Sequence, residues 1–300
     1  MSTLPGATGV RTRTIDLSVV VVSYRSLRLL EDCLATWRPA VQGLRAELLV
    51  VENGTGEPVA DRLRVLCPAA RVTTLAQSVG FAAAVNAGAR GARGRHVALL
   101  NPDTLLGPRS LTRMVRYLDR HPDAGIVGPR VWDDPGRTSL QRSWRRFPGL
   151  STSIFNRYSL LSRVWPSNPW TRAYLNLDQP ADRVQDTDWV SGCCLVIRGT
   201  LLLLLGGLDA DYPMFCEDVD VCRCCHRAGM RVVYLPRAEI VHLVGGSRRR
   251  VRLRSLWMRH RSMAHYVLKW RGANSPLAWV LVAGVWARFA VQASLGARTG

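Results

Sequence analysis

Leu17-Ser18-Val19-Val20-Val21-Val22-Ser23-Tyr24 is the stretch that decides the fold. Its β-branched run has no polar alternation after Ser18, which is typical of a strand buried on both faces of a parallel sheet. We therefore expect a central strand from Leu17 to Val22. Residues 1–16 before it form a short polar tail without the basic-then-apolar pattern of a secretory signal, so the expected compartment is the cytoplasm.

Helix and strand signals alternate after this first run. Apolar residues at spacings of three and four from Leu27 to Trp37 predict a helix that Ser26 caps and Pro39 ends. Further strands are expected at Leu48 to Val51 and at His96 to Leu100, and further helices at Val79 to Ala92 and after Pro108. This order is the signature of an α/β fold, a doubly wound and mostly parallel sheet with helices on both faces.

The second half of the chain begins with a poorly patterned segment, 131–188, rich in Pro, Trp, Arg and Ser. Its aromatic and guanidinium groups suit an acceptor-binding role, although an ordinary loop is an equal alternative. Order returns with a strand at 189–197, an apolar run at 201–205, a helix from Glu217 to Gly229 and strands near Val232 and Ile240. We predict one domain over 17–247.

The C-terminal residues 248–300 are basic and helical by pattern. An arginine run at 248–250 precedes an amphipathic helix, and eleven uncharged residues, 277–287, follow Pro276. Extension to Leu295 includes Arg288 and Gln292, which favours a helix lying on an anionic membrane surface over a true span. Packing of this segment on the domain is the second alternative.

Composition limits the partners without choosing among them. The net charge of +19 indicates an anionic partner such as a nucleotide, lipid phosphates, a membrane surface or nucleic acid. Six of the eight cysteines fall between Cys193 and Cys225, so a zinc site or disulfides are alternatives, but adjacent cysteine pairs suit a metal poorly and we expect them to pack as small apolar residues.

Polar residues follow three of the predicted strands. Ligands of open α/β sheets bind beyond the carboxyl ends of the strands, so Ser23 and Tyr24, Glu52 and Asn53, and the Asn101-Pro102-Asp103 segment are expected to meet at one crevice. The sequence contains neither a GxGxxG nor a GxxxxGK[ST] motif. A dinucleotide-binding Rossmann site and a P-loop are therefore not supported.

Several motifs resemble those of family-2 glycosyltransferases with the GT-A fold, and cover 17–247 in the family's order. The likeness is closest to bacterial rhamnosyltransferases of cell-wall and polysaccharide assembly. The motifs are Val19 to Tyr24, Val51-Glu52-Asn53-Gly54-Thr55, Val79 to Asn86, Leu100-Asn101-Pro102-Asp103-Thr104, Val190 to Arg198, Gly206-Gly207-Leu208-Asp209, Glu217-Asp218-Val219-Asp220-Val221, Arg227-Ala228-Gly229 and Val241-His242.

The resemblance implies a binding site for a nucleotide-sugar donor and a divalent metal, Mg²⁺ or Mn²⁺. Asp103 matches the last acid of the family's DxD motif, Asn101 replaces the first acid, and His242 matches a histidine that coordinates the same ion. A metal there acts as a Lewis acid on the departing diphosphate. The residues implied in donor binding are Ser23, Tyr24, Glu52, Asn53, Gly80, Phe81, Asn86, Asn101 and Asp103.

The resemblance also implies an inverting reaction in which Asp218 is the general base and Glu217 and Asp220 orient it or bind the acceptor. The implied donor includes dTDP-rhamnose, and the implied acceptor is a glycan or a polyprenyl-diphosphate-linked sugar at the inner face of the cell membrane. No nucleic acid is expected as a partner.

Two rival functions compete with this interpretation. A basic nucleic-acid-binding protein without catalysis would explain the charge and the arginine runs, but no recognised nucleic-acid motif is present. A glycoside hydrolase that uses Asp103 with Asp218 needs only two carboxylates about 5 to 10 Å apart. A requirement for a metal and a nucleotide donor separates the predicted transferase from both.

Overall fold

The computed structural model describes residues 15–149, 165, 168–243 and 253–297. The tail at 1–14, part of the variable segment at 150–164, the glycines that follow His242 and the arginine run at 248–250 lie outside the described residues.

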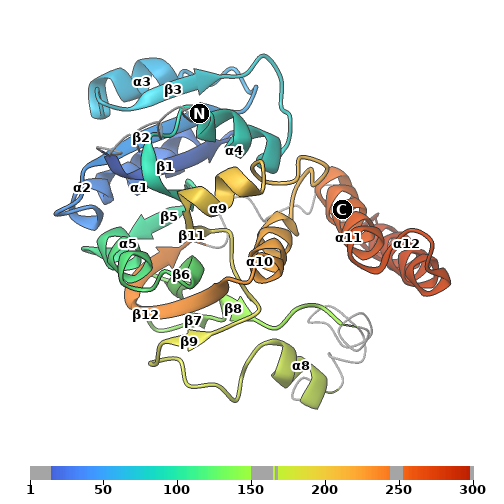
Figure 1. The fold of residues 1–300 in the computed structure, drawn as a ribbon. Helices are drawn as coiled ribbons and strands as arrows, with labels where there is room; N and C mark the ends of the chain where they lie inside the picture. The colour runs from blue at the N-terminus through green and yellow to red at the C-terminus, as the bar shows by residue number, and fades with distance from the viewer. Residues whose placement is uncertain (1–14, 150–164, 166–167, 244–252, 298–300) are drawn as a thin grey trace, which may run out of the picture.

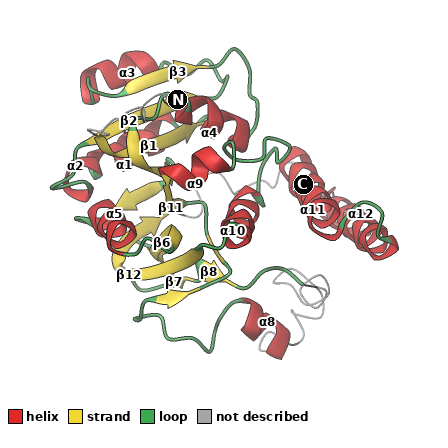
Figure 2. Ribbon diagram, viewed as in Figure 1, coloured by secondary structure: helices red, strands yellow, loops and turns green. Residues whose placement is uncertain are grey.

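A ten-stranded sheet forms the centre of the molecule (Figures 1 and 2), in the order β3-β2-β1-β4-β11-β6-β12-β5 with β7 beside β6 and β9 beside β12. Pairings β3–β2, β2–β1, β1–β4 and β6–β12 are parallel, and β11 runs antiparallel between β4 and β6. The strands are β1 Ile15–Ser23, β2 Ala46–Glu52, β3 Arg71–Thr74, β4 Gly94–Leu100, β5 Thr104–Leu106, β6 Ala124–Trp132, β7 Leu140–Gln141, β9 Gln185–Asp186, β11 Cys194–Arg198 and β12 Arg231–His242, with β8 Trp144–Arg145 and β10 Trp189–Val190 paired as a small second sheet.

Helices cover both faces of this sheet, as predicted. They are α1 Leu27–Ala35, α2 Trp37–Ala40, α3 Val59–Leu66, α4 Phe81–Ala89, α5 Ser110–Arg120, α8 Pro169–Tyr174, α9 Gly199–Leu204, α10 Glu217–Arg227, α11 Leu253–Arg271 and α12 Pro276–Ala297. Strand β1 contributes Val19 and Val21 to the core beneath α1 and α5, and Val20 and Val22 to the core beneath α4 and α9. Burial on both faces explains why its apolar run is unbroken.

Two local predictions were wrong in detail. The strand expected at 189–197 is two strands, β10 and β11, and the strands expected near Val232 and Ile240 are one strand, β12, with an irregularity between Leu235 and Glu239. The apolar run at 201–205 lies mainly in α9. The runs at 194–197 and 232–235 are apolar because they are buried, so their periodicity does not show where one strand ends and the next begins.

The entry to α1 also differs from the prediction. The Ser26 side chain makes no cap bond to the helix; instead Glu57 accepts hydrogen bonds from the backbone N–H groups of Ser26 and Leu27, at 3.0 and 3.4 Å. Pro39 lies inside α2 rather than ending the helix before it, because a proline lacks only an N–H that the first turn does not use.

The C-terminal helices form a pair that projects from one side of the domain (Figure 1). Helix α11 is tied to α10, since Arg223 donates a hydrogen bond to the Tyr266 hydroxyl at 2.9 Å and Lys269 pairs with Asp220 at 2.8 Å. Helix α11 therefore packs on the domain, while the alternatives above concern the segment of α12. Helix α12 is long and apolar enough to cross a membrane by length and composition, with a mean hydropathy of 1.4 over Pro276–Ser294.

Candidate active site

The carboxyl ends of β1, β2 and β4 meet at one edge of the sheet. Ser23 is in register with Glu52, and Asn53 donates its backbone N–H to the Ser23 carbonyl at 2.9 Å. On the other side of β1, Val21 is in register with Leu100, which brings Asn101 to the same edge. The three polar segments predicted to meet are therefore neighbours.

Glu52 is almost fully buried at this edge. Its Oε1 accepts hydrogen bonds from the backbone N–H of Thr55, at 2.7 Å, and from the Thr55 hydroxyl, while its Oε2 is buried without a hydrogen-bond partner among the described residues. A buried carboxylate oxygen without a partner is costly, and it is available to a donor group of a ligand. This geometry suits recognition of an N–H group of a nucleotide base.

Asn53 shapes the loop that leads into α4. Its side chain accepts the Val79 N–H at 3.0 Å and donates to the Gly80 carbonyl at 3.4 Å. Gly80 has φ +89°, and a Cβ there would lie 2.9 Å from the Pro213 carbonyl oxygen. Glycine is therefore required at this position, where the start of α4, including Phe81, approaches the loop before α10.

Asp103 and His242 are 139 residues apart and come together because β5 pairs antiparallel with the end of β12. Thr104 is in register with His242, and Leu243 donates its N–H to the Asp103 carbonyl at 2.9 Å. His242 Nε2 lies 3.3 Å from Asp103 Oδ1, an oxygen that makes no hydrogen bond within the described chain. Gln141 Oε1 lies 3.2 Å from His242 Nδ1, so a proton there leaves the Nε2 lone pair facing Asp103.

Asp218 sits in the first turn of α10. Its Oδ2 accepts the Gly192 N–H at 2.9 Å, and its Oδ1 accepts the Val219 N–H at 2.9 Å. Phe215 and Cys216, just before the helix, both have positive φ, of 68° and 69°. This conformation is unfavourable for such side chains, and it fixes the direction in which α10 begins.

Burial raises the pKa of both acids at the start of α10. Desolvation, together with the neighbouring Asp218 charge, raises the pKa of Glu217 to about 8. Desolvation also raises the pKa of Asp218, against the hydrogen bonds from Gly192 and Val219 and the charge of Arg145. A carboxylate with a raised pKa is a stronger proton acceptor, as a general base requires.

Cys193 lies between the two halves of the site. Its carbonyl accepts the Asn101 N–H at 2.8 Å, and it follows directly on Gly192, which holds Asp218. Burial raises the pKa of the Cys193 thiol to about 12, and the charges of Asp103 and Asp218 both add to this rise. Both carboxylates therefore act on the same buried residue, and they do not belong to separate regions of the fold.

The remaining residues predicted to bind the nucleotide-sugar differ in whether their side chains are already engaged in hydrogen bonds. Tyr24 is exposed, and the buried Ser23 hydroxyl lies 3.2 Å from that of Ser26. The Asn86 amide, by contrast, accepts the Leu208 N–H at 2.8 Å and donates to the Leu208 carbonyl at 2.7 Å. These bonds give Asn86 a structural role, holding α4 to the Gly207-Leu208 turn.

Sequence patterns did not single out several groups around Asp218. Burial raises the pKa of Asp218 and the pKa of Tyr174, and the charge of Arg145 opposes the rise in both. Asp220, which the resemblance assigns to orientation or acceptor binding, is buried and accepts hydrogen bonds from Tyr212 at 3.1 Å, Lys269 at 2.8 Å and Trp270 at 2.7 Å. It therefore links α10 to α11.

A second acidic group, Asp209, Asp211 and His265, is close enough to hold a metal ion. Asp209 Oδ2, however, already accepts hydrogen bonds from Lys269 at 2.7 Å and His265 at 3.0 Å. Although burial opposes it, these bonds lower the pKa of Asp209 to about 2. A lysine cation at this oxygen disfavours a second cation, so Asp103 with His242 is the better metal candidate.

The alternative zinc or disulfide roles of the cysteines find no support in the described residues, where we expected the cysteines to pack as small apolar residues. All eight are free thiols, and Cys193, Cys194, Cys222 and Cys225 are buried in the two core clusters.

Comparison with known proteins agrees with this geometry. The family described as "Glycosyltransferase like family 2" matches residues 15–265. The chain belongs to glycosyltransferase family 2. This glycosyltransferase is 31% identical over 282 residues to the N-acetylglucosaminyl-diphospho-decaprenol L-rhamnosyltransferase of Mycobacterium tuberculosis, covering 88% of this chain and 89% of that protein. It is 26% identical to rhamnosyltransferase WbbL of Escherichia coli K12, over 49% of this chain and 52% of that one.

Solved structures show the same fold at lower identity. The mannosyltransferase PcManGT from Pyrobaculum calidifontis, in complex with GDP-Man and Mn²⁺, aligns over 93% of this glycosyltransferase and 70% of its own chain, with a TM-score of 0.59 and 19% identity. GalNAc-T7 with UDP, GalNAc and Mn²⁺ aligns over 77% and 44%, with a TM-score of 0.55 and 13% identity. The family match favours the transferase over the two rival functions.

Proposed function

We propose that this glycosyltransferase moves a sugar, with inversion and with the aid of a divalent metal, from a nucleoside-diphosphate donor to a hydroxyl of a lipid-linked glycan. The observation that carries the proposal is that the Asp103–His242 pair and Asp218 are joined through neighbouring residues: Asn101 donates its N–H to the Cys193 carbonyl, and the adjacent Gly192 donates its N–H to Asp218. Asp103 and His242 suit a metal that binds a diphosphate, and Asp218 suits the role of proton acceptor.

The donor side consists of Asp103 and His242. A carboxylate oxygen without a hydrogen bond, 3.3 Å from an imidazole nitrogen that is oriented by Gln141, fits the ligands of a single divalent ion. When bound, Mg²⁺ or Mn²⁺ supplies Lewis-acid stabilisation of the departing diphosphate. Glu52, through its unpartnered Oε2, is proposed to contact the base of the nucleotide, with Ser23 and Tyr24 beside it.

The acceptor side depends on Asp218. As the acceptor oxygen forms its bond to the anomeric carbon and the bond to the diphosphate breaks, Asp218 takes the hydroxyl proton. Hydrogen bonds from Gly192 and Val219 hold the carboxylate in place, and each of its oxygens keeps a further lone pair for that proton. Glu217 beside it holds a proton up to about pH 8, which limits charge repulsion within the pair.

The finer assignment follows the names of the relatives. The mycobacterial relative acts as an L-rhamnosyltransferase on N-acetylglucosaminyl-diphospho-decaprenol. By similarity, we propose that the present chain transfers rhamnose from dTDP-rhamnose to a polyprenyl-diphosphate-linked sugar. The identity of 31% over most of both chains supports this substrate class.

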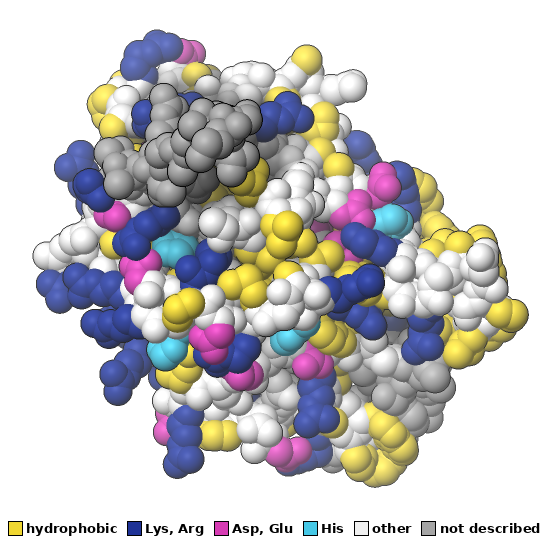
Figure 3. Space-filling model, in the orientation of Figure 1, with side chains coloured by type: hydrophobic (Ala, Val, Ile, Leu, Met, Phe, Trp, Pro, Cys, Tyr) yellow, Lys and Arg dark blue, Asp and Glu magenta, His cyan; other side chains and the backbone are white. Residues whose placement is uncertain are grey.

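A lipid-linked acceptor calls for contact with a membrane surface, and the C-terminal region suits one. From Ile240 to Gly300 the sequence has no Asp or Glu but eleven Lys or Arg residues. In α12, Leu277, Trp279, Val280 and Val291 are exposed, and Figure 3 shows apolar side chains gathered over this projecting pair of helices. A basic region with an exposed apolar helix favours peripheral binding to anionic lipid at the inner face of the membrane.

Transfer by the Asp218→Asn variant tests the proposal. We expect the variant to bind the nucleotide-sugar with Mn²⁺ as the wild type does, and to lose transfer by a factor of about 10³ or more, as for removal of a general base together with its orienting role. The measurement is release of nucleoside diphosphate from a panel of nucleotide sugars, with a polyprenyl-diphosphate-linked N-acetylglucosamine as acceptor. Transfer at the wild-type rate contradicts the role of Asp218.

A further inference from the structure

Helix α11 brings a cation to the start of α10, the helix that carries Asp218. The Arg259 guanidinium lies over the Phe215 ring, with its central carbon 4.6 Å from the ring centroid, and Phe215 precedes Asp218 by three residues. Farther along α11, the Ser262 hydroxyl donates a hydrogen bond to the Met214 carbonyl at 2.8 Å. The loop that leads into α10 is therefore held against α11 beside this cation.

Arg288 of α12 lies near the same place. The His260 ring of α11 meets the Phe289 ring of α12 edge to face, with the ring centroids 5.5 Å apart. His260 directly follows Arg259 in the sequence, just as Phe289 directly follows Arg288 in the next helix. Burial lowers the pKa of His260, and the charges of Arg288 and Arg259 lower it further. Two arginines from two helices therefore act on one buried imidazole.

His260 also holds a polar atom that the described chain does not satisfy. Its side chain is fully buried, and Nδ1 donates to the Leu256 carbonyl at 2.8 Å, whereas Nε2 has no hydrogen-bond partner among the described residues. A buried nitrogen of this kind is unfavourable unless another group satisfies it. An anion beside the imidazole favours its protonated form, in which Nε2 donates a hydrogen bond. The junction of α11 and α12 therefore suits a negatively charged group.

An acceptor of the proposed class carries such a group on the sugar that reacts. Its diphosphate is attached to the anomeric carbon, so one pyranose ring separates the diphosphate from the hydroxyl that faces Asp218. Two neighbouring phosphates match two guanidinium groups, because a guanidinium pairs with phosphate oxygens through planar, bidentate hydrogen bonds. Helix α11 contains neither Asp nor Glu, so it adds no carboxylate that would repel the diphosphate.

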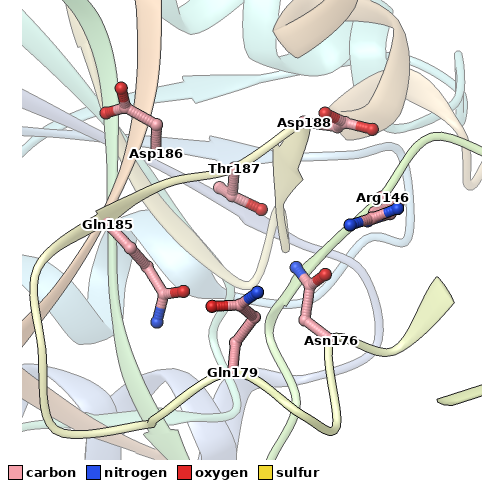
Figure 4. Close-up of a pocket in the computed structure, with 7 residues that line it drawn as sticks. All are labelled: Arg146, Asn176, Gln179, Gln185, Asp186, Thr187 and Asp188. Carbon is pink, nitrogen blue, oxygen red and sulfur yellow. The ribbon is translucent and has the colours of Figure 1, made fainter. Parts of the chain in front are cut away.

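A polar cavity beside α8 (Figure 4) offers another cation, Arg146, but suits a diphosphate less well. Asp186 and Asp188 also line it, and Arg146 is the one cation among its described lining residues. Two carboxylates repel a dianion. Figure 1 shows α11 between α10 and α12, so an isoprenoid chain that starts from a diphosphate at Arg259 extends toward the exposed apolar side chains of α12.

We propose that Arg259 and Arg288 bind the diphosphate of the lipid-linked acceptor, with its isoprenoid chain directed along α12. This inference rests on the proposed function for the class of acceptor, but binding of the diphosphate requires neither donor nor metal. It assigns Arg259 and Arg288 to acceptor binding, separate from the transfer of a proton to Asp218.

Binding of a diphosphate-linked sugar without donor or metal is the test. The probe is farnesyl-diphospho-N-acetylglucosamine, titrated into the full chain in detergent and followed by calorimetry. Octyl N-acetylglucosaminide, which has an alkyl chain but no phosphate, is the neutral counterpart. The variants are Arg259→Gln and Arg288→Gln. Arg261→Gln is the matched control, because it removes one charge from the same helix at a side chain that lies over the Trp257 ring, 5.5 Å from its centroid.

We expect Arg259→Gln and Arg288→Gln to bind the diphosphate probe about tenfold or more weakly than the wild type, because each loses a charge-assisted contact with phosphate. Arg261→Gln should bind as the wild type does, and Arg259→Lys, which keeps the charge, should bind more tightly than Arg259→Gln. The inference is overturned by any of four results: no binding by the wild type, an equal loss in Arg261→Gln, an equal loss for the neutral glycoside, or displacement of the probe by phosphatidylglycerol.

The same measurements separate this site from the catalytic proposal. Asp218→Asn should bind the diphosphate probe normally while losing transfer. Normal transfer by that variant refutes the role of Asp218 and leaves the arginine site standing. Transfer by the wild type with undiminished probe binding in both arginine variants refutes the site and leaves the proposed function standing.

Discussion

Gly192 donates a hydrogen bond to the Asp218 carboxylate and packs closely against the same side chain. The Gly192 N–H donates to Asp218 Oδ2 at 2.9 Å, and a Cβ on Gly192 would lie 3.1 Å from Asp218 Cβ. Gly192→Ala should displace Asp218, the proposed base, by a few tenths of an ångström and lower kcat by about tenfold, since a displacement of about 1 Å can cost a hundredfold. Steady-state kinetics check this, with Gly284→Ala as control because its methyl group meets nothing within 4 Å. An unchanged kcat would show that Asp218 tolerates movement.

Asp103→Asn should raise the Mn²⁺ concentration needed for half-maximal transfer by roughly tenfold or more, because it removes the charge of the proposed carboxylate ligand. The control is Asp211→Asn, in the other acidic group, which we expect to leave the titration unchanged. Metal titrations of both variants distinguish the two places. If the metal titration shifts only in Asp211→Asn, the ion binds at the group that contains Asp209 and not at Asp103.

The pKa of Glu217 predicts a pH-dependent stability. Because burial raises it from 4.5 to about 8, the folded protein holds a proton that the unfolded chain releases between these values, and stability falls as pH rises through this window. Glu217→Gln should therefore match the wild type near pH 4 and unfold at a higher temperature, by roughly 2 °C or more, at pH 8 to 9. Thermal unfolding across pH measures this, and Glu31→Gln, which removes the partly exposed partner of Arg62, should show no such gain.

Lys269→Met should destabilise the fold by roughly 1 to 3 kcal/mol, because it removes the cation beside the buried Asp220 carboxylate. This loss of stability is smaller than for a fully buried ion pair, because the Lys269 side chain is 30% exposed. The double variant with Asp220→Asn should recover most of the loss. A double variant no more stable than Lys269→Met in thermal unfolding would refute the charge explanation.

Trp279→Ser should weaken binding to vesicles that contain about 30% anionic lipid, by several-fold in co-sedimentation, because an exposed indole anchors a helix at the interface. Val65→Ser on α3, which replaces an even more exposed apolar side chain outside α12, is the control. Equal loss in both variants, or no binding by the wild type, contradicts membrane contact through α12.

The sequence was sufficient for the part of the site that lies on parallel strands. Ser23, Glu52 and Asn101 follow buried apolar runs, and the rule that such strands align their carboxyl ends places them together. The neighbours Asp103 and His242 could not be derived this way, because β5 turns back against β12 after a long stretch of chain. Only the family resemblance suggested that pair.

Contacts from irregular or distant segments escaped prediction altogether. Arg145 comes from a two-residue strand inside the unpatterned segment, and Lys269 from a helix whose basic residues suggested lipid. Asn86 matched a family motif, but its amide is committed to Leu208. Such roles depend on tertiary pairing, which periodicity and local propensity do not encode.

The ion pair between Asp220 and Lys269 has a consequence for biosynthesis. Until Lys269 has left the ribosome, α10 lacks the cation that pairs with Asp220. A nascent or truncated chain that ends earlier therefore has the proposed base Asp218 on a helix with an uncompensated buried acid. The helix that carries the proposed base is thus completed only with α11, the helix that leads into α12.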